Sequence, residues 1–447
     1  MAENDIPFEK EAVLDFDFTM EEAIAEATRC LYCKKPFCTE ACPVSNDISL
    51  FNKAIATGNF GEAGDIIAAH SNLPAICGRV CPRENQCEGA CILGRKGKPI
   101  EIGKLERFAA DFCMDHHLKK VKRIVKVSGK VAVIGAGPAG LTIAYDLIRL
   151  GYTVTVYDAG QEGGGIMMYG IPAFRLHKNI VRREIEALKE WGVQFVFDTC
   201  IGKDKTMADL RSEYDAVFIG MGTHSAQPLP LEGDTLPGMI EASAFLTLVQ
   251  QVQNGTADFA DIPVKQGDRV IVIGAGNVAI DAVRTAHRLT GEAKIVYRRG
   301  KINMKCLPSE YEEALADGVT FQFYSAPKGV VGENKVEGLR YERQEILADA
   351  TMVPTGEYGI VPADKIIVAV GNQPDKDLLE GMDGLALNKW NYIITNESPY
   401  YGMTSLTGVF AAGDIVHEPA TIVKAVQQAK QVSIGISFYL KDTLGQA

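Results

Sequence analysis

The chain has 447 residues, a formal net charge of −11 and 47% hydrophobic residues, with 44 glycines and 11 cysteines. This length suggests about three domains, each large enough to bury a core. The acidic balance and the lack of a Lys/Arg block argue against a nucleic-acid partner, which would need phosphate attraction. Because there is no signal-like start and no apolar run of spanning length, we expect a soluble cytoplasmic protein without a membrane span.

The cysteines are unevenly distributed. Eight of the 11 lie between positions 30 and 91, namely Cys30, Cys33, Cys38, Cys42, Cys77, Cys81, Cys87 and Cys91. In a chain with no secretory signal, such clustering is more typical of metal or iron–sulfur ligands than of disulfides. Apolar residues at helical spacing before the first cysteine predict that this N-terminal domain is helical.

The first four cysteines resemble a ferredoxin-type run ending in Cys-Pro, with a wider second gap. In two-cluster runs of that type the fourth cysteine serves the other cluster, and we expect this of Cys42. By spacing alone, the second group supplies the remaining thiolates, with Cys77 among them. Zinc is the competing interpretation, although only Cys30 and Cys33 have the Cys-x2-Cys spacing that structural zinc sites favour. The third interpretation is that these cysteines are inert buried thiols.

A first nucleotide site is predicted from a strand at 131–134, a glycine turn, a helix, and a second strand at 153–157 that ends at Asp158. The glycines permit a tight turn, the helix N-terminus receives a pyrophosphate, and the acid can accept a hydrogen bond from a ribose hydroxyl. The turn residues are Gly135, Gly137, Pro138, Ala139 and Gly140.

The same unit recurs further along the chain, which predicts a second nucleotide site. Its residues are Gly274, Gly276, Asn277, Val278, Ala279 and, on the following helix, Asp281. The second strand of this unit ends in Arg298 and Arg299 where the first has an acid. An arginine pair suits the 2′-phosphate of NADPH, and NADH is the alternative. The competing interpretation is a pair of solvated arginines at a strand end.

A third segment, the strand ending in Gly413 and Asp414, precedes an expected helix at 421–430. After two dinucleotide units, such a strand is what a flavin domain needs to hold the ribityl chain or pyrophosphate of FAD. The NADPH domain would then be inserted between the two halves of the flavin domain.

Taken together, these motifs resemble the small (beta) subunit of NADPH-dependent glutamate synthase and its relatives. The relatives include the large subunit of NADH-dependent ferredoxin:NADP oxidoreductase and the N-terminal half of dihydropyrimidine dehydrogenase. Further segments carry the resemblance, including Cys77-Gly-Arg-Val-Cys81-Pro82, Cys87-Glu-Gly-Ala-Cys91, Gly164-Gly165 and Tyr169-Gly-Ile-Pro-Ala-Phe-Arg175. The agreement runs in order along nearly the whole chain.

The resemblance implies FAD on the first site, NADPH on the second and two [4Fe-4S] clusters. One cluster would take Cys30, Cys33, Cys38 and Cys91, and the other Cys42, Cys81, Cys87 and a non-cysteine ligand at Glu106. Cys77 would then be a bystander, whereas spacing alone selects it as the eighth ligand. Gly164, Gly165 and Arg175 join the residues expected to contact a cofactor.

The expected fold is α/β, with a helical iron–sulfur domain at 1–125, an FAD domain at 126–262 and 371–447, and an NAD(P)H domain at 263–370. We expect an electron-input subunit of a hetero-oligomer that serves a catalytic or acceptor subunit. No catalytic acid or base is expected, because the cofactors carry the chemistry. An electron-bifurcating flavin subunit, a relay or scaffold subunit with an unused nucleotide pocket, and a self-sufficient diaphorase are the alternatives.

Overall fold

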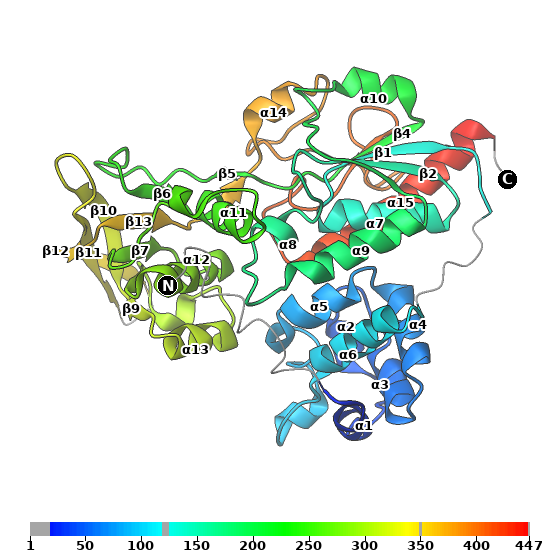
Figure 1. Ribbon diagram of the computed structural model, residues 1–447, viewed down its shortest axis with the longest axis horizontal. Helices are drawn as coiled ribbons and strands as arrows, with labels where there is room; N and C mark the ends of the chain where they lie inside the picture. Colours follow the sequence, from blue (N-terminus) through cyan, green and yellow to red (C-terminus); the bar gives the residue numbers. More distant parts are fainter. Residues whose placement is uncertain (1–17, 119–124, 348–350, 446–447) are drawn as a thin grey trace. The chain divides into compact units, whose positions relative to one another are not determined.

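The computed structural model describes residues 18–118, 125–347 and 351–445 (Figure 1). These residues form two compact units. One holds residues 169–174, 224–347 and 351–372, and the other holds 18–118, 125–168, 175–223 and 373–445. All 11 cysteines lie in the described ranges as free thiols. In those ranges, no helix combines the length and the apolar character that a membrane crossing requires.

The N-terminal part of the larger unit is helical, as predicted. Its helices are α1 (Met20–Thr28), α2 (Phe37–Ala41), α3 (Ile48–Ala56), α4 (Phe60–His70), α5 (Pro74–Val80) and α6 (Ile102–Asp115), with 3₁₀ turns at Arg83–Asn85 and Ile92–Arg95. Thr19 and Glu22 form a capping box that starts α1. Phe51, Ile55 and Leu105 are fully buried among the helices and make a small core. The cysteine-bearing loops are therefore attached to a packed helical support.

The same unit contains a parallel five-stranded sheet in the order β15-β4-β1-β2-β3. Its strands are β1 (Lys130–Ile134), β2 (Thr153–Tyr157), β3 (Gln194–Val196), β4 (Ala216–Ile219) and β15 (Val409–Ala411). Figure 1 shows α7 (Pro138–Arg149) and α15 (Ile422–Leu444) packed side by side against this sheet. The unit also holds α9 (Lys178–Glu190), α10 (Met207–Glu213), α14 (Lys376–Glu380) and the first three residues of α8 (Ile166–Tyr169).

The smaller unit repeats this topology in a parallel sheet ordered β6-β13-β7-β8-β9. Its strands are β6 (Met239–Glu241), β7 (Val270–Ile273), β8 (Ala293–Val296), β9 (Thr320–Gln322) and β13 (Lys365–Val368). The helices are α11 (Ala242–Gln253), α12 (Asn277–Thr290) and α13 (Pro308–Ala316), with 3₁₀ turns at Phe259–Asp261 and Lys301–Asn303. An antiparallel sheet adds β10 (Ser325–Val331), β11 (Gly338–Ile346) and β12 (Met352–Pro362).

The insertion of one Rossmann-like unit in the other is confirmed by strand pairing. Strand β15 comes from near the end of the chain, yet it pairs in parallel with β4, so the chain returns to its first sheet after residues 224–372. The smaller unit begins at 224, ahead of the expected position 263, because β6 joins the second sheet. A short two-stranded sheet of β5 (Ser225–Ala226) and β14 (Asn372–Gln373) lies where the chain enters and leaves that unit.

A buried polar network ties the helical part to the first sheet within the larger unit. The Asn72 side chain, 1% exposed, donates to Asp146 Oδ1 at 2.9 Å and to the Thr142 carbonyl at 3.2 Å. Lys430 on α15 donates to Asn72 Oδ1 at 3.2 Å, and Ser433 donates to Asp146 Oδ2 at 3.1 Å. One amide thus links three segments that are far apart in sequence, which fixes the helical part against α7 and α15.

We expect Asn72→Leu to lower the free energy of unfolding by about 1–3 kcal/mol, because Lys430 loses an acceptor and Asp146 a donor in a buried place. Thermal unfolding followed by circular dichroism measures this as a lower midpoint. The exposed Asn59 provides the control Asn59→Ala, because the one side-chain hydrogen bond of its amide among the described residues is to Thr57 at 3.1 Å. Equal midpoints for the two variants would contradict the role given to Asn72.

Candidate functional site

The first glycine turn joins β1 to α7 and has the geometry of a phosphate-binding loop. Gly135 has a φ of +95°, and a Cβ there would lie 2.7 Å from the Gly220 carbonyl oxygen, so only glycine fits. Nothing lies within 4 Å of a Cβ built on Gly137, which leaves open space at the start of α7. Pro138 is the first residue of α7 and needs no amide partner there. The remaining first-turn amides of the helix can therefore receive an anion.

Asp158, which was expected to bind a ribose hydroxyl, accepts hydrogen bonds from backbone amides of the structure itself. Its Oδ2 accepts from the Ala136 amide at 2.6 Å and its Oδ1 accepts from the Gly160 amide at 2.8 Å. The carboxylate therefore fixes the shape of the glycine turn. Because an ionised carboxylate has about four acceptor positions, a ribose hydroxyl can still be bound there, and that role stays a prediction.

Two further predicted segments meet the first turn. The Gly164 amide donates to the Ala136 carbonyl at 2.8 Å, and a Cβ on Gly165 would lie 3.0 Å from Gly137 Cα. A Cβ on Gly413 would lie 3.3 Å from that of Ala139 on α7. The structure thus brings 164–165 and 413–414 to the same turn.

Asp414 and Arg175 complete the expected set in this unit. Asp414 Oδ1 accepts from the Ala420 amide at 3.1 Å, and burial raises the pKa of this carboxyl. The Gly413 amide donates to Gln428 Oε1 at 2.7 Å, a contact that the sequence did not indicate. Arg175 is half-buried just after α8. Its role as a cofactor contact stays a prediction.

The second glycine turn, between β7 and α12, has the same form in the smaller unit. Gly274 has a φ of +139°, and a Cβ on Gly276 would meet nothing within 4 Å. At the start of α12, Asn277 and Val278 are exposed, whereas Ala279 and Asp281 are buried. The turn therefore offers the same open helix N-terminus as the first.

Arg298 and Arg299 lie at the end of β8, beside the second turn in sheet order. Both side chains are exposed, and among the described residues neither guanidinium has a hydrogen-bond or ion-pair partner. By contrast, the buried Arg284 pairs with Glu313 at 2.6 Å and Asp317 at 2.7 Å. Two unpaired cations at this strand end can bind a dianion such as a 2′-phosphate.

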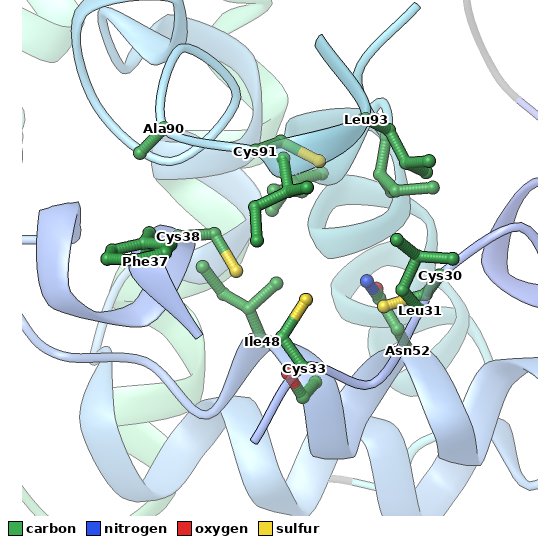
Figure 2. Close-up of a pocket in the computed structure, with 14 residues that line it drawn as sticks. Cys30, Leu31, Cys33, Phe37, Cys38, Ile48, Asn52, Ala90, Cys91 and Leu93 are labelled. Atoms are coloured by element: carbon green, nitrogen blue, oxygen red, sulfur yellow. The ribbon is translucent and has the colours of Figure 1, made fainter. Parts of the chain in front are cut away.

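A pocket in the helical part gathers four cysteines from two separate segments. Cys30, Cys33 and Cys38 line it from the first segment and Cys91 from the second. Figure 2 shows their sulfur atoms turned toward one shared space. The rest of the lining is mostly apolar, including Ile48 and Leu93. The four side chains are the set that the family resemblance implied for one cluster.

The remaining cluster cysteines lie near Glu106. Burial raises the pKa of Cys42 and of Cys87, and the nearby Glu106 carboxylate adds to both shifts. A hydrogen bond with Cys77, together with burial, raises the pKa of Cys81. Both candidates for the eighth ligand, Cys77 and Glu106, therefore lie beside the same thiols. The choice between them stays a prediction.

Glu106 is held on α6 in an environment unusual for a carboxylate. Burial raises its pKa to about 8, against the opposing effects of the Arg83 charge and of a hydrogen bond from Asn46. The donor is Asn46 Nδ2, 3.5 Å from Glu106 Oε1. A buried carboxylate among thiols is costly unless a cation compensates it.

These donors suit an iron–sulfur cluster chemically. Burial raises the pKa of Cys38 to about 11, and iron bound to such a thiol would favour its thiolate form. Within the described ranges, no three His, Cys, Asp or Glu side chains are placed as ligands of a single metal ion. The remaining cysteines are not grouped with these, and burial raises the pKa of Cys306 to about 11.

The sequence patterns did not indicate several residues that surround the cysteines. Asn46 and Asn52 are 2% and 0% exposed, and Arg83 faces Glu106. The signal available for Asn52 was a lone amide among apolar residues, since its neighbours Phe51 and Ile55 are buried core residues. Spacing rules for cysteines do not include such positions.

Two family models match the chain in succession. Residues 9–118 match dihydropyrimidine dehydrogenase domain II with a 4Fe-4S cluster, and residues 129–429 match the pyridine nucleotide-disulphide oxidoreductase family. The first covers the helical part and the second covers both parallel sheets.

Curated relatives match over nearly the full length. The glutamate synthase [NADPH] small chain of Halomonas elongata is 36% identical, over 94% of this chain and 91% of the relative. That of Escherichia coli is 36% identical, over 95% of this chain and 93% of the relative. Among solved structures, Mycobacterium tuberculosis FprA in complex with NADPH has a TM-score of 0.60 at 19% identity, covering 72% of this chain and 87% of FprA. This last likeness concerns the fold alone.

Two glycine-to-alanine substitutions test the geometry of the first glycine turn. We expect Gly135→Ala to destabilise the ligand-free protein by about 1–3 kcal/mol, because its φ is positive and its Cβ would meet the Gly220 carbonyl. Gly137→Ala should change stability by less than about 0.5 kcal/mol, since its Cβ would enter open space. Thermal unfolding measures both, and an equal loss in the two variants would contradict the described turn.

Proposed function

Because this chain belongs to the family of glutamate synthase small chains, we propose that it is an electron-input subunit. In this proposal it oxidises NADPH at FAD and passes the electrons through two [4Fe-4S] clusters to a catalytic or acceptor subunit. The match to the pyridine nucleotide-disulphide oxidoreductase family places the chain among NAD(P)H-dependent oxidoreductases. The second cluster, the partner and a cytoplasmic location are part of the proposal.

The observation that carries the proposal is the meeting of four thiols in one pocket of a chain that also has two Rossmann-like sheets. Cys91 comes from a different segment than Cys30, Cys33 and Cys38, yet all four line the same space. An enzyme that only passed hydride between nucleotide and flavin would not need this pocket. The cysteines supply a route for single electrons.

The cofactors supply the redox chemistry, since a flavin takes a hydride and releases single electrons to iron–sulfur clusters. The chain itself would bind the cofactors and orient them. In the larger unit, the open amides at the start of α7 would hold a pyrophosphate, while Asp158 keeps the turn in shape through Ala136 and Gly160. Asp414 follows β15 at the carboxyl edge of the same sheet, where ligands of such folds bind.

In the smaller unit, the second turn would hold the pyrophosphate of NADPH, and the side chains of Arg298 and Arg299 would bind its 2′-phosphate. Their lack of protein partners among the described residues supports this assignment. In the helical part, Cys30, Cys33, Cys38 and Cys91 would hold one cluster, and Cys42, Cys81, Cys87 and Glu106 the other.

Anaerobic titration of the holoprotein with NADPH and, separately, NADH tests the proposal. Absorbance follows the flavin and low-temperature EPR follows the clusters. We expect flavin bleaching together with reduced-cluster signals, at lower concentration for NADPH. A flavin that stays oxidised with both nucleotides would refute electron input and support a relay subunit. Bleaching without any cluster signal on any timescale would instead indicate a diaphorase.

The double variant Arg298→Ala, Arg299→Ala should raise the KM for NADPH about 10- to 100-fold, because each guanidinium would lose a charge-assisted hydrogen bond. The KM for NADH, which lacks the 2′-phosphate, should change little. Steady-state reduction of a dye measures both constants. Arg343→Ala, which removes an exposed arginine of the same unit, is the control. An unchanged NADPH-to-NADH preference would rule out the 2′-phosphate assignment.

Glu106→Ala and Cys77→Ala together decide the eighth cluster ligand. We expect Glu106→Ala to lose about half of the bound iron or alter one of two EPR signals, because one iron would lose its protein ligand. Cys77→Ala should keep both. Iron analysis and EPR of the anaerobically purified variants make the comparison. The opposite pattern would assign the ligand to Cys77.

A further inference from the structure

Asn52 is an anomaly in the wall of the four-cysteine pocket. It is 0% exposed, and neither its Oδ1 nor its Nδ2 has a hydrogen-bond partner among the described residues. Buried amides are almost always hydrogen-bonded, so an amide with both atoms unpaired indicates a missing partner. Of the residues that line this pocket, only Ser49 and Asn52 are polar apart from the cysteines.

The position of Asn52 on α3 aims it at the pocket. Ile48 and Ser49, four and three residues earlier, line the same pocket, so these positions share one face of the helix. The adjacent face buries Phe51 and Ile55 in the helical core. Figure 2 shows the amide end of Asn52 turned into the pocket that Cys30 also lines. A leucine would pack in this wall without leaving a polar group unpaired.

We infer that Asn52 donates a hydrogen bond from Nδ2 to a sulfur of the cluster bound by Cys30, Cys33, Cys38 and Cys91, and thereby raises the reduction potential of that cluster. The inference rests on the proposed function, because it requires a cluster in this pocket. The sulfur acceptor is either a bridging sulfide or one of the four cysteine thiolates, since both kinds of sulfur are anionic and accept hydrogen bonds.

The direction of the effect follows from charge. A reduced cluster carries one more negative charge than an oxidised one, so its sulfurs accept hydrogen bonds more strongly. A fixed N–H donor therefore stabilises the reduced state, and hydrogen bonds to sulfur are among the factors that set cluster potentials. In a mostly apolar wall, water competes little with this donor. Asn52 is thus a positioning and tuning residue and makes no bond to iron.

Potentiometric titration of the holoprotein, monitored by EPR, tests the inference. We expect Asn52→Leu to keep its full iron content while the ratio of reduced to oxidised cluster, at a fixed potential, falls about tenfold. For a one-electron couple that is a potential lower by about 59 mV. Asn52→Gln, which keeps an amide, should retain part of the wild-type value. The signal of the second cluster should not move in either variant.

The control is Ser71→Ala, which also removes a buried and unpartnered polar group of the helical part but one that does not line the pocket. We expect wild-type potentials for it. Unchanged potentials in Asn52→Leu, or an equal shift in Ser71→Ala, would overturn the inference.

If Asn52→Leu fails to assemble the cluster, a measurement on the wild-type protein still tests the hydrogen bond from Asn52. Asparagine labelled with ¹⁵N should produce a nitrogen hyperfine coupling to the reduced cluster of this pocket, since Asn52 is the one asparagine in its lining. Absence of that coupling would overturn the inference. Wild-type protein without any iron–sulfur signal would instead refute the proposed function, so the two failures can be told apart.

Discussion

Burial of sulfur and carboxylate side chains in a small helical core is the constraint on which the rest of this molecule depends. Cys38 and Glu106 have pKa values raised by burial to about 11 and about 8. Such groups are expensive to ionise in an apolar setting, and Arg83 is the cation that faces Glu106. Bound iron would supply the missing positive charge, which couples folding of this part to its cofactor.

The two parallel sheets use the same glycine turn for two different ligands. Each places an open glycine turn at a helix N-terminus, with Gly137 in one and Gly276 in the other. What differs is the end of the neighbouring strand. Asp158 accepts hydrogen bonds from backbone amides, whereas Arg298 and Arg299 have no partner in the part of the chain that the structure describes. The first arrangement shapes a turn, whereas the second leaves charge available for a phosphate.

The local motifs were predictable because they are short. The strand, turn and helix order around Gly135 and Gly274 predicted both sheets, and the last strand before Asp414 predicted the insertion that pairing of β15 with β4 confirms. The convergence of Cys91 with the first three cysteines came from the family resemblance. Spacing alone did not select that set.

Long-range packing was not predictable in the same way. The antiparallel sheet at 325–362 depends on pairing between strands of weak local pattern, and β6 joins a sheet whose next strand in sequence starts about 30 residues later. The network of Asn72 joins segments more than 350 residues apart, as in the 3.2 Å contact of Lys430. Asn46 and Asn52 are recognised only once the structure shows that they are buried, that Asn46 bonds to Glu106 and that both polar atoms of Asn52 have no partner among the described residues.

Iron and acid-labile sulfide analysis of the anaerobically purified protein, with a Mössbauer spectrum of the same sample, tests the central claim most directly. The account predicts about eight irons and eight sulfides per chain, in the valence-averaged state of two [4Fe-4S] clusters. Zinc bound without labile sulfide, or thiols free of any metal after anaerobic isolation, would contradict it.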